Sequence, residues 1–155
     1  MKLVVDKLIK NNKTIATMES CTGGGLVNEL TNIEGVSQAI KFSAVTYSNE
    51  YKIKMGVDKN IIDKYSVYSM ETAIEMSKNI SKFANSNYGV GITGKLNRVD
   101  ENNLFGNDNQ VFISIYDRDN DKYYNYDIIV NKKTRRQNKK LVIDLIEEKL
   151  IEIIK

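Results

Sequence analysis

The sequence contains no histidine, and this absence excludes several kinds of catalytic site. Ser-His-Asp and Cys-His arrangements cannot form without an imidazole, and neither can the zinc sites that use histidine ligands. Acid–base or nucleophilic chemistry in this chain therefore has to use lysine, tyrosine, carboxylates, serine or the single cysteine, Cys21.

The presence of only one cysteine excludes an internal disulfide and a multi-cysteine metal cage, so we expect a reducing, cytoplasmic compartment. No apolar run approaches the roughly 20 residues that a membrane span needs, so we expect no membrane. Residues 1–12 also lack the apolar segment and the small-residue cleavage site of a secretory signal.

Proline and tryptophan are absent as well, and the basic residues are nearly all lysine, a pattern typical of genomic base-composition drift. Runs of lysine and asparagine are therefore weak functional signals. The net charge of +3 is too small to indicate nucleic acid by itself. With 155 residues, of which 41% are hydrophobic and 28% charged, the chain is typical of a single soluble domain over residues 1–155.

Apolar periodicity predicts alternating helices and strands along the chain. We expect helices at 1–12, 25–33, 49–55, 58–65, 70–83 and 134–154, and strands at 14–18, 39–47, 88–93, 110–116 and 122–130. The last two strands flank a short polar turn and predict a hairpin. The polar segment 95–109 is expected to be functional or disordered. Together these elements favour an α/β fold, a layered α/β/α domain with a mixed, partly antiparallel sheet.

The first candidate site is the segment 19–25, which has the sequence Glu-Ser-Cys-Thr-Gly-Gly-Gly between a predicted strand and a predicted helix. In this position Ser20 would project from the carboxyl edge of the sheet. The backbone N–H groups of the turn would be free to hold a phosphate or an oxyanion. A simpler interpretation is a tight turn in which Ser20 or Thr22 only caps the helix.

The second candidate is the segment 45–52, Val-Thr-Tyr-Ser-Asn-Glu-Tyr-Lys, where another predicted strand passes into a helix. Without histidine, a serine nucleophile needs a different base. Lys52 can serve if burial or a nearby cation lowers its pKa from about 10.4. Spacing alone does not distinguish Lys52 from a solvated helix lysine.

The third candidate is the segment 132–140, in which six of nine residues are basic, at the start of the last predicted helix. Cations at a helix N-terminus oppose the helix dipole, and a bound phosphate would explain them. A solvated basic face is the alternative. Nucleic acid is not the expected partner, because the segment has no interleaved aromatic residues.

The first two segments resemble the motifs of a known family. Thr14-Ile-Ala-Thr-Met-Glu-Ser-Cys-Thr-Gly-Gly resembles the opening motif of the CinA C-terminal-domain family, the nicotinamide-nucleotide amidases, and the segment 45–52 resembles its second motif. Residues 55–57 and 71–76 are similar to further family segments. The likeness runs in chain order over nearly the whole sequence and is strongest over residues 14–57.

This resemblance implies a metal-free and cofactor-free amidohydrolase of pyridine nucleotide salvage, which converts nicotinamide mononucleotide to nicotinate mononucleotide and ammonia. Ser20 matches the family's nucleophile, Lys52 its general base and Tyr47 a tyrosine of the same site. The matched substrate contacts are backbone donors at Thr22, Gly23 and Gly24, the Thr93-Gly94 pair, and Arg135 for the phosphate, with Arg136 as the alternative to Arg135.

Cys21 is a rival nucleophile because it follows Ser20 directly. Adjacent side chains point in different directions, and no imidazole is present to activate the thiol. A packing role is therefore preferred for Cys21.

The chain departs from the family pattern in the half that closes over the substrate. The family continues after Thr93-Gly94 with a glycine- and proline-containing loop, whereas residues 95–101 contain neither residue type. Three alternatives follow: hydrolysis of nicotinamide mononucleotide with a remodelled loop, hydrolysis of a related carboxamide, or binding of a nucleotide or phosphate without turnover. The expected partner is a small nucleotide, and association into a homo-oligomer stays open.

Overall fold

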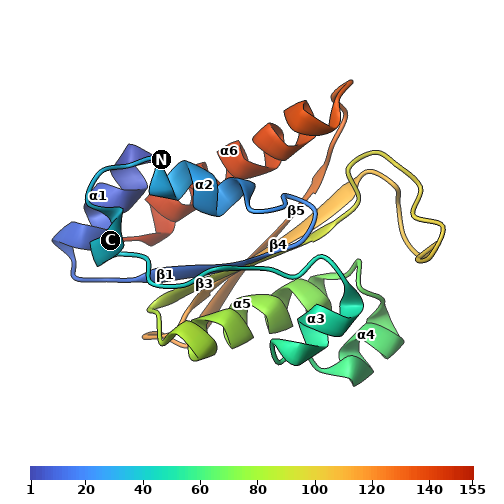
Figure 1. Ribbon diagram of the computed structural model, residues 1–155, viewed down its shortest axis with the longest axis horizontal. Coiled ribbons are helices and arrows are strands. Elements are labelled where there is room, and N and C mark those ends of the chain that lie inside the picture. The colour runs from blue at the N-terminus through green and yellow to red at the C-terminus, as the bar shows by residue number, and fades with distance from the viewer.

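A five-stranded mixed sheet forms the centre of the protein, whose computed structural model describes residues 1–155 (Figure 1). Its strands are β1 (Ile15–Glu19), β2 (Ala44–Val45), β3 (Tyr88–Gly94), β4 (Gln110–Asp117) and β5 (Lys122–Ile129). They lie in the order β2-β1-β3-β4-β5, in which the first three are parallel and the last two pair antiparallel. The predicted α/β fold with a partly antiparallel sheet is confirmed, including the hairpin.

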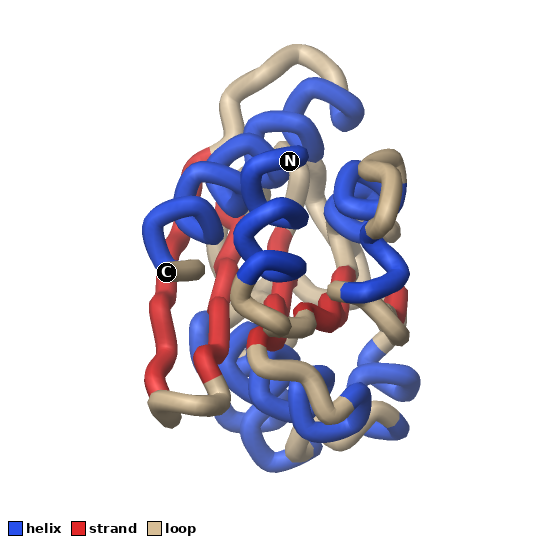
Figure 2. Tube along the Cα trace, turned by 90° about the vertical axis from the view of Figure 1, so that its left-hand side faces the viewer, coloured by secondary structure: helices blue, strands red, loops and turns tan.

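Helices cover both faces of this sheet (Figures 1 and 2). One face carries α1 (Lys2–Lys10), α2 (Gly25–Thr31) and α6 (Arg135–Ile153), and the other carries α3 (Asn49–Lys54), α4 (Lys59–Tyr65) and α5 (Met70–Ala84). A short 3-10 helix, η1 (Val36–Gln38), precedes β2. A cluster of 22 buried apolar residues lies mainly beneath the first group, and a cluster of 7 lies beneath the second.

Local capping explains why the longer helices begin where the sequence predicts. The Ser69 side chain accepts a hydrogen bond from the N–H of Thr72, as expected of an N-cap. Thr134 and Gln137 form a reciprocal capping box at the start of α6. This box stabilises the first turn of α6, which carries Arg135.

The α5 helix packs directly on the backbone of β3. An added Cβ at Gly89 would lie 2.0 Å from the Ser77 carbonyl oxygen, and one at Gly91 would lie 2.3 Å from the Ala73 carbonyl oxygen. Only glycine permits this close approach, which lets the helix cover the centre of the sheet.

The predicted buried strand over residues 39–47 is wrong in length and in burial. Only Ala44 and Val45 form a strand, and Val45 and Tyr47 are exposed. This segment lies at the sheet edge, where β1 is its only partner, so its apolar side chains meet no second neighbour. Phe83, near the end of α5, is also exposed and packs against Phe42 with ring centroids 4.9 Å apart.

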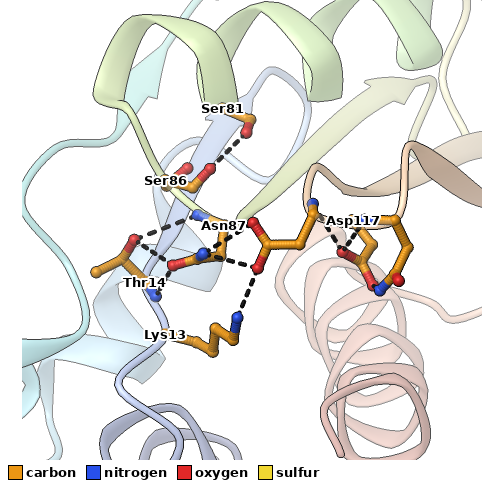
Figure 3. A network of polar contacts seen from close by, with 8 residues as sticks. Lys13, Thr14, Ser81, Ser86, Asn87 and Asp117 are labelled. Atoms are coloured by element: carbon orange, nitrogen blue, oxygen red, sulfur yellow. Dashed lines mark hydrogen bonds and ion pairs between the residues drawn. The ribbon is translucent and has the colours of Figure 1, made fainter.

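A polar network closes the end of the sheet at which β1 and β3 begin (Figure 3). The Asn87 side-chain oxygen accepts from the Thr14 N–H at 2.9 Å, and the Asn87 amide donates to Asp119 at 2.9 Å. Lys13 Nζ donates to the same Asp119 carboxylate at 2.6 Å. These bonds join the α1–β1 connection, the α5–β3 connection and the β4–β5 turn.

Candidate active site

Ser20 and Lys52 are brought together by neighbouring parallel strands. Ser20 directly follows β1, and Lys52 lies on α3, which begins four residues after β2. The carboxyl ends of parallel strands meet at one edge of a sheet, so both segments open on the same side. The Ser20 N–H donates to the Ile92 carbonyl at 3.0 Å, which ties Ser20 to β3 as well.

Lys52 is a buried amine within hydrogen-bond distance of the Ser20 hydroxyl. Its Nζ lies 3.1 Å from Ser20 Oγ and donates to the Thr46 carbonyl oxygen at 2.7 Å. The residue is only 1% exposed, and this burial lowers the pKa of Lys52 from 10.5 to about 8. A neutral amine in this position has a lone pair available to accept the Ser20 proton.

The pair opens on a cleft of about 780 Å³. Five of the residues predicted from the sequence line it: Ser20, Lys52, Tyr47, Gly94 and Arg135. The Arg135 guanidinium donates to the Tyr47 hydroxyl at 2.9 Å. The cleft therefore combines a serine hydroxyl and a buried amine at one place with a cation held by a tyrosine at another.

The segment 95–109 forms part of the cleft wall. The sequence predicts that this segment is either functional or disordered. Residues 95, 96 and 98–103 of this segment line the cleft, together with Tyr68 from the α4–α5 connection. Lys95 Nζ donates to Asp108 at 3.1 Å, and Tyr68 donates its hydroxyl proton to Asp100. This bond lowers the pKa of the Asp100 carboxyl. Figure 1 shows the loop extending beyond the sheet.

Sequence reasoning missed Tyr68 and Asp100 as cleft residues. They lie 32 positions apart and belong to no motif, so no local signal connects them. A hydrogen bond from the Thr93 hydroxyl to the Val67 carbonyl oxygen, at 2.8 Å, joins the two segments at the end of β3.

Two of the three predicted turn donors, Gly23 and Gly24, are already engaged within the protein. Gly24 donates its N–H to the Glu19 carboxylate at 3.1 Å, and Gly23 donates to the Ser20 carbonyl at 2.9 Å. Thr22 and Thr93 are buried outside the cleft wall, where their hydroxyls donate to Glu19 and to a backbone carbonyl. In this structure the N–H groups of Gly23 and Gly24 are not available to a ligand.

Cys21 is buried beside Ser20 and belongs to the larger apolar cluster. Burial raises the pKa of the Cys21 thiol to about 12, so the thiolate is scarce at neutral pH. These features favour the predicted packing role over the rival nucleophile.

The two neighbouring arginines of the basic segment face different cavities. Arg135 lines the main cleft, whereas Arg136 lines a second cavity of about 390 Å³ between α2 and α6. No group of three or more cysteine, aspartate or glutamate side chains is placed to hold a metal ion. No helix combines the length and the apolar character that crossing a membrane requires.

Comparison with known families gives a match to the CinA C-terminal domain over residues 1–145. The chain belongs to this family. A relative from Clostridium botulinum, named competence-damage inducible protein, is 46% identical over 94 residues, which cover 60% of this chain and 23% of that protein. Another of the same name, from Clostridium acetobutylicum, is 50% identical over 88 residues, which cover 56% of this chain and 21% of that protein. The chain thus spans less than a quarter of the length of these relatives.

Solved CinA superfamily structures share the fold of the whole chain. A competence-damaged protein (CinA) superfamily protein from Klebsiella pneumoniae matches with a TM-score of 0.90 at 21% identity, covering 99% of this chain and 94% of that one. A competence or damage-inducible protein from Enterobacter asburiae matches with a TM-score of 0.91 at 19% identity, covering 99% of this chain and 95% of that one. The CinA fold is therefore retained, including the sheet edge at which the cleft opens.

Proposed function

We propose that this protein hydrolyses the carboxamide of nicotinamide mononucleotide, yielding nicotinate mononucleotide and ammonia. The observation that carries the proposal is the 3.1 Å separation between the buried Lys52 Nζ and Ser20 Oγ at the floor of an open cleft. Membership of the CinA family, which the motifs relate to nicotinamide-nucleotide amidases, supports this type of reaction.

In the proposed mechanism, Ser20 attacks and Lys52 moves the protons. Neutral Lys52 accepts the Ser20 hydroxyl proton while Oγ bonds to the carboxamide carbon. The tetrahedral intermediate collapses, the carbon–nitrogen bond breaks, and the Lys52 ammonium protonates the departing ammonia. Water then attacks the acyl-enzyme with Lys52 again as the base, which releases the carboxylate and restores Ser20.

Arg135 is proposed to orient the nucleotide, and Tyr47 to hold the Arg135 guanidinium in place. The Arg135 guanidinium has no carboxylate partner, and its bond to the Tyr47 hydroxyl leaves further N–H donors free for a phosphate. Tyr47 is 63% exposed at the cleft, where it can also act as the alternative proton donor to the leaving group.

Ammonia release from purified protein and nicotinamide mononucleotide tests the proposal. We expect Ser20→Ala and Lys52→Ala to lower kcat by at least about 10⁴-fold, because each removes one member of a coupled pair. Arg135→Gln should instead raise KM by about 10- to 100-fold through the loss of a charged phosphate contact. Lys54→Ala is the matched control, since Lys54 is exposed on the same helix, where its ammonium pairs with Glu50 and lies over the Tyr51 ring.

The dependence on pH supplies a second readout of the same experiment. Only neutral Lys52 is active as the base, so kcat/KM should rise with pH and level off above about 8. Full activity in Ser20→Ala would refute the proposed nucleophile. Nucleotide binding without ammonia release from the wild type would contradict hydrolysis and favour the ligand-binding alternative.

A further inference from the structure

The fully buried Glu19 carboxylate organises the turn that carries Ser20. It accepts hydrogen bonds from the backbone N–H groups of Gly24, Leu26 and Val27 at 3.1, 3.1 and 2.8 Å. The Thr22 hydroxyl adds a fourth bond at 2.6 Å. A single side chain therefore fixes the turn from position 22 to position 27.

The backbone of Glu19 reaches the base as well. Its carbonyl oxygen accepts from the Thr46 N–H at 2.8 Å, and the Thr46 carbonyl accepts from Lys52 Nζ at 2.7 Å. Lys52 in turn lies 3.1 Å from Ser20 Oγ. Glu19 thus connects the turn that holds the nucleophile with the segment that holds the base.

Two donors of the turn remain free after these bonds are made. The N–H groups of Cys21 and Thr22 donate to no backbone carbonyl and to no side chain of another residue, whereas Gly23, Gly24 and Gly25 each donate to a group of the turn itself. Buried N–H groups without an acceptor are rare and need an explanation. These two immediately follow the nucleophile, and Cys21 lines the cleft.

We propose that the backbone N–H groups of Cys21 and Thr22 form the oxyanion site, and that Glu19 is the positioning residue that holds them in place. During attack by Ser20, the carboxamide oxygen becomes negatively charged, and donors aimed at that position stabilise it. By taking the N–H groups of Gly24, Leu26 and Val27, the Glu19 carboxylate fixes the turn that carries these donors. This inference rests on the proposed amidase function.

Labelling with a small alkyl fluorophosphonate tests the donor assignment without using the proposed substrate. Ser20 Oγ bonds to phosphorus, the phosphorus–fluorine bond breaks, fluoride leaves and Lys52 takes the hydroxyl proton. The phosphonyl oxygen then occupies the position of the oxyanion. In ¹⁵N-labelled protein, the amide proton signals of Cys21 and Thr22 should shift downfield. Those of Leu26 and Val27 should stay in place, because they already donate to Glu19.

The variant Glu19→Gln tests the positioning role. The glutamine amide replaces one acceptor oxygen with a donor, so the turn shifts and kcat should fall about 100-fold with KM unchanged within about twofold. The midpoint of the pH profile should stay near 8, because the base is retained. Glu29→Gln, at an exposed carboxylate on α2, is the matched control and should behave as wild type. Thr22→Val removes one donor to Glu19 and should slow labelling about tenfold.

The outcomes separate this inference from the proposed function. Downfield shifts at Gly23 and Gly24 instead of Cys21 and Thr22 would overturn the donor assignment, even with full amidase activity. An unchanged kcat in Glu19→Gln would overturn the positioning role. Labelling with the expected shifts but without ammonia release would refute the nicotinamide substrate and support the oxyanion site. A wild type that neither reacts nor releases ammonia would contradict both.

Discussion

At the scale of the residue, the burial of Lys52 that the proposed chemistry requires also lowers the stability of the fold. Its burial disfavours the ammonium form, so the folded protein holds this proton less tightly than the unfolded chain does. The same desolvation that supplies a neutral base at moderate pH therefore lowers the free energy of unfolding.

Replacing the amine should accordingly stabilise the fold. The pKa of Lys52 is about 8 in the folded state and near 10.5 in the unfolded state, so the unfolded chain binds more protons between these values. Stability therefore rises with pH through this window, and the full penalty applies below pH 8. We expect Lys52→Met to raise the free energy of unfolding at pH 7 by about 2 kcal/mol, after about 1 kcal/mol is lost at the Thr46 carbonyl.

Urea denaturation of both proteins from pH 7 to pH 10.5 measures this effect. The advantage of Lys52→Met should shrink steadily as the pH rises, and Lys54→Met, at an exposed position, should show no such trend. A constant difference between wild type and Lys52→Met across the range would contradict the expected proton linkage.

At the scale of the element, the contact between α5 and β3 depends on two glycines. The backbones approach so closely at Gly89 and Gly91 that a methyl group would overlap helix backbone atoms, which cannot move without shifting the whole helix. This packing also sets the position of Gly94, the last residue of β3, at the cleft.

Gly91→Ala should therefore destabilise the protein by about 3 kcal/mol, seen as a lower urea midpoint. Gly25→Ala is a suitable control. A Cβ at Gly25 would meet only the flexible end of the Ile143 side chain, at 2.8 Å, and alanine favours the first turn of a helix. Equal losses in the two variants would show that close backbone approach is not the cause.

The elements also show which features a sequence can predict. The starts of α5 and α6 lie within one residue of their predicted positions because helix capping depends on residues within one turn. The strand over residues 39–47 was predicted too long because β-propensity does not tell how many neighbouring strands will pair with a segment.

In the candidate site, too, the features set by local motifs were predicted, whereas those set by tertiary contacts were not. Ser20 and Lys52 were placed from motifs at the ends of consecutive strands, and the structure brings them within hydrogen-bond distance. The predicted donors Gly23 and Gly24 already bond to the Ser20 carbonyl and to the Glu19 carboxylate, contacts that the sequence motif does not reveal. The contribution of Tyr68 to the cleft depends on tertiary contacts alone.

At the scale of the whole molecule, the cleft and the polar network lie at opposite ends of β1 and β3. Ser20 follows the last residue of β1, whereas Thr14 precedes the first. With five strand residues between them, Thr14 and Ser20 are separated by about 20 Å. Stabilising contacts and proposed chemistry are therefore spatially separated.

Asn87→Ala should consequently change stability without changing catalysis. The substitution leaves the Thr14 N–H and the Asp119 carboxylate without their shared partner, at an expected cost of about 1–3 kcal/mol. We expect kcat/KM at 25 °C to stay within about twofold of wild type. Asn60→Ala, at an exposed side chain on α4, controls for loss of an asparagine. A tenfold fall in kcat/KM for Asn87→Ala would show that the two ends are coupled.

The buried amine of Lys52 also makes the protein selectively reactive toward electrophiles. With a pKa of about 8, roughly a fifth of the Lys52 side chains are unprotonated at pH 7.4, against about one in a thousand for a lysine of ordinary pKa. Lys52 also lines a cleft of about 780 Å³ that a small aromatic aldehyde can enter. Imine formation followed by reduction should therefore mark Lys52 ahead of the solvated lysines, giving a covalent label for the cleft that does not depend on turnover.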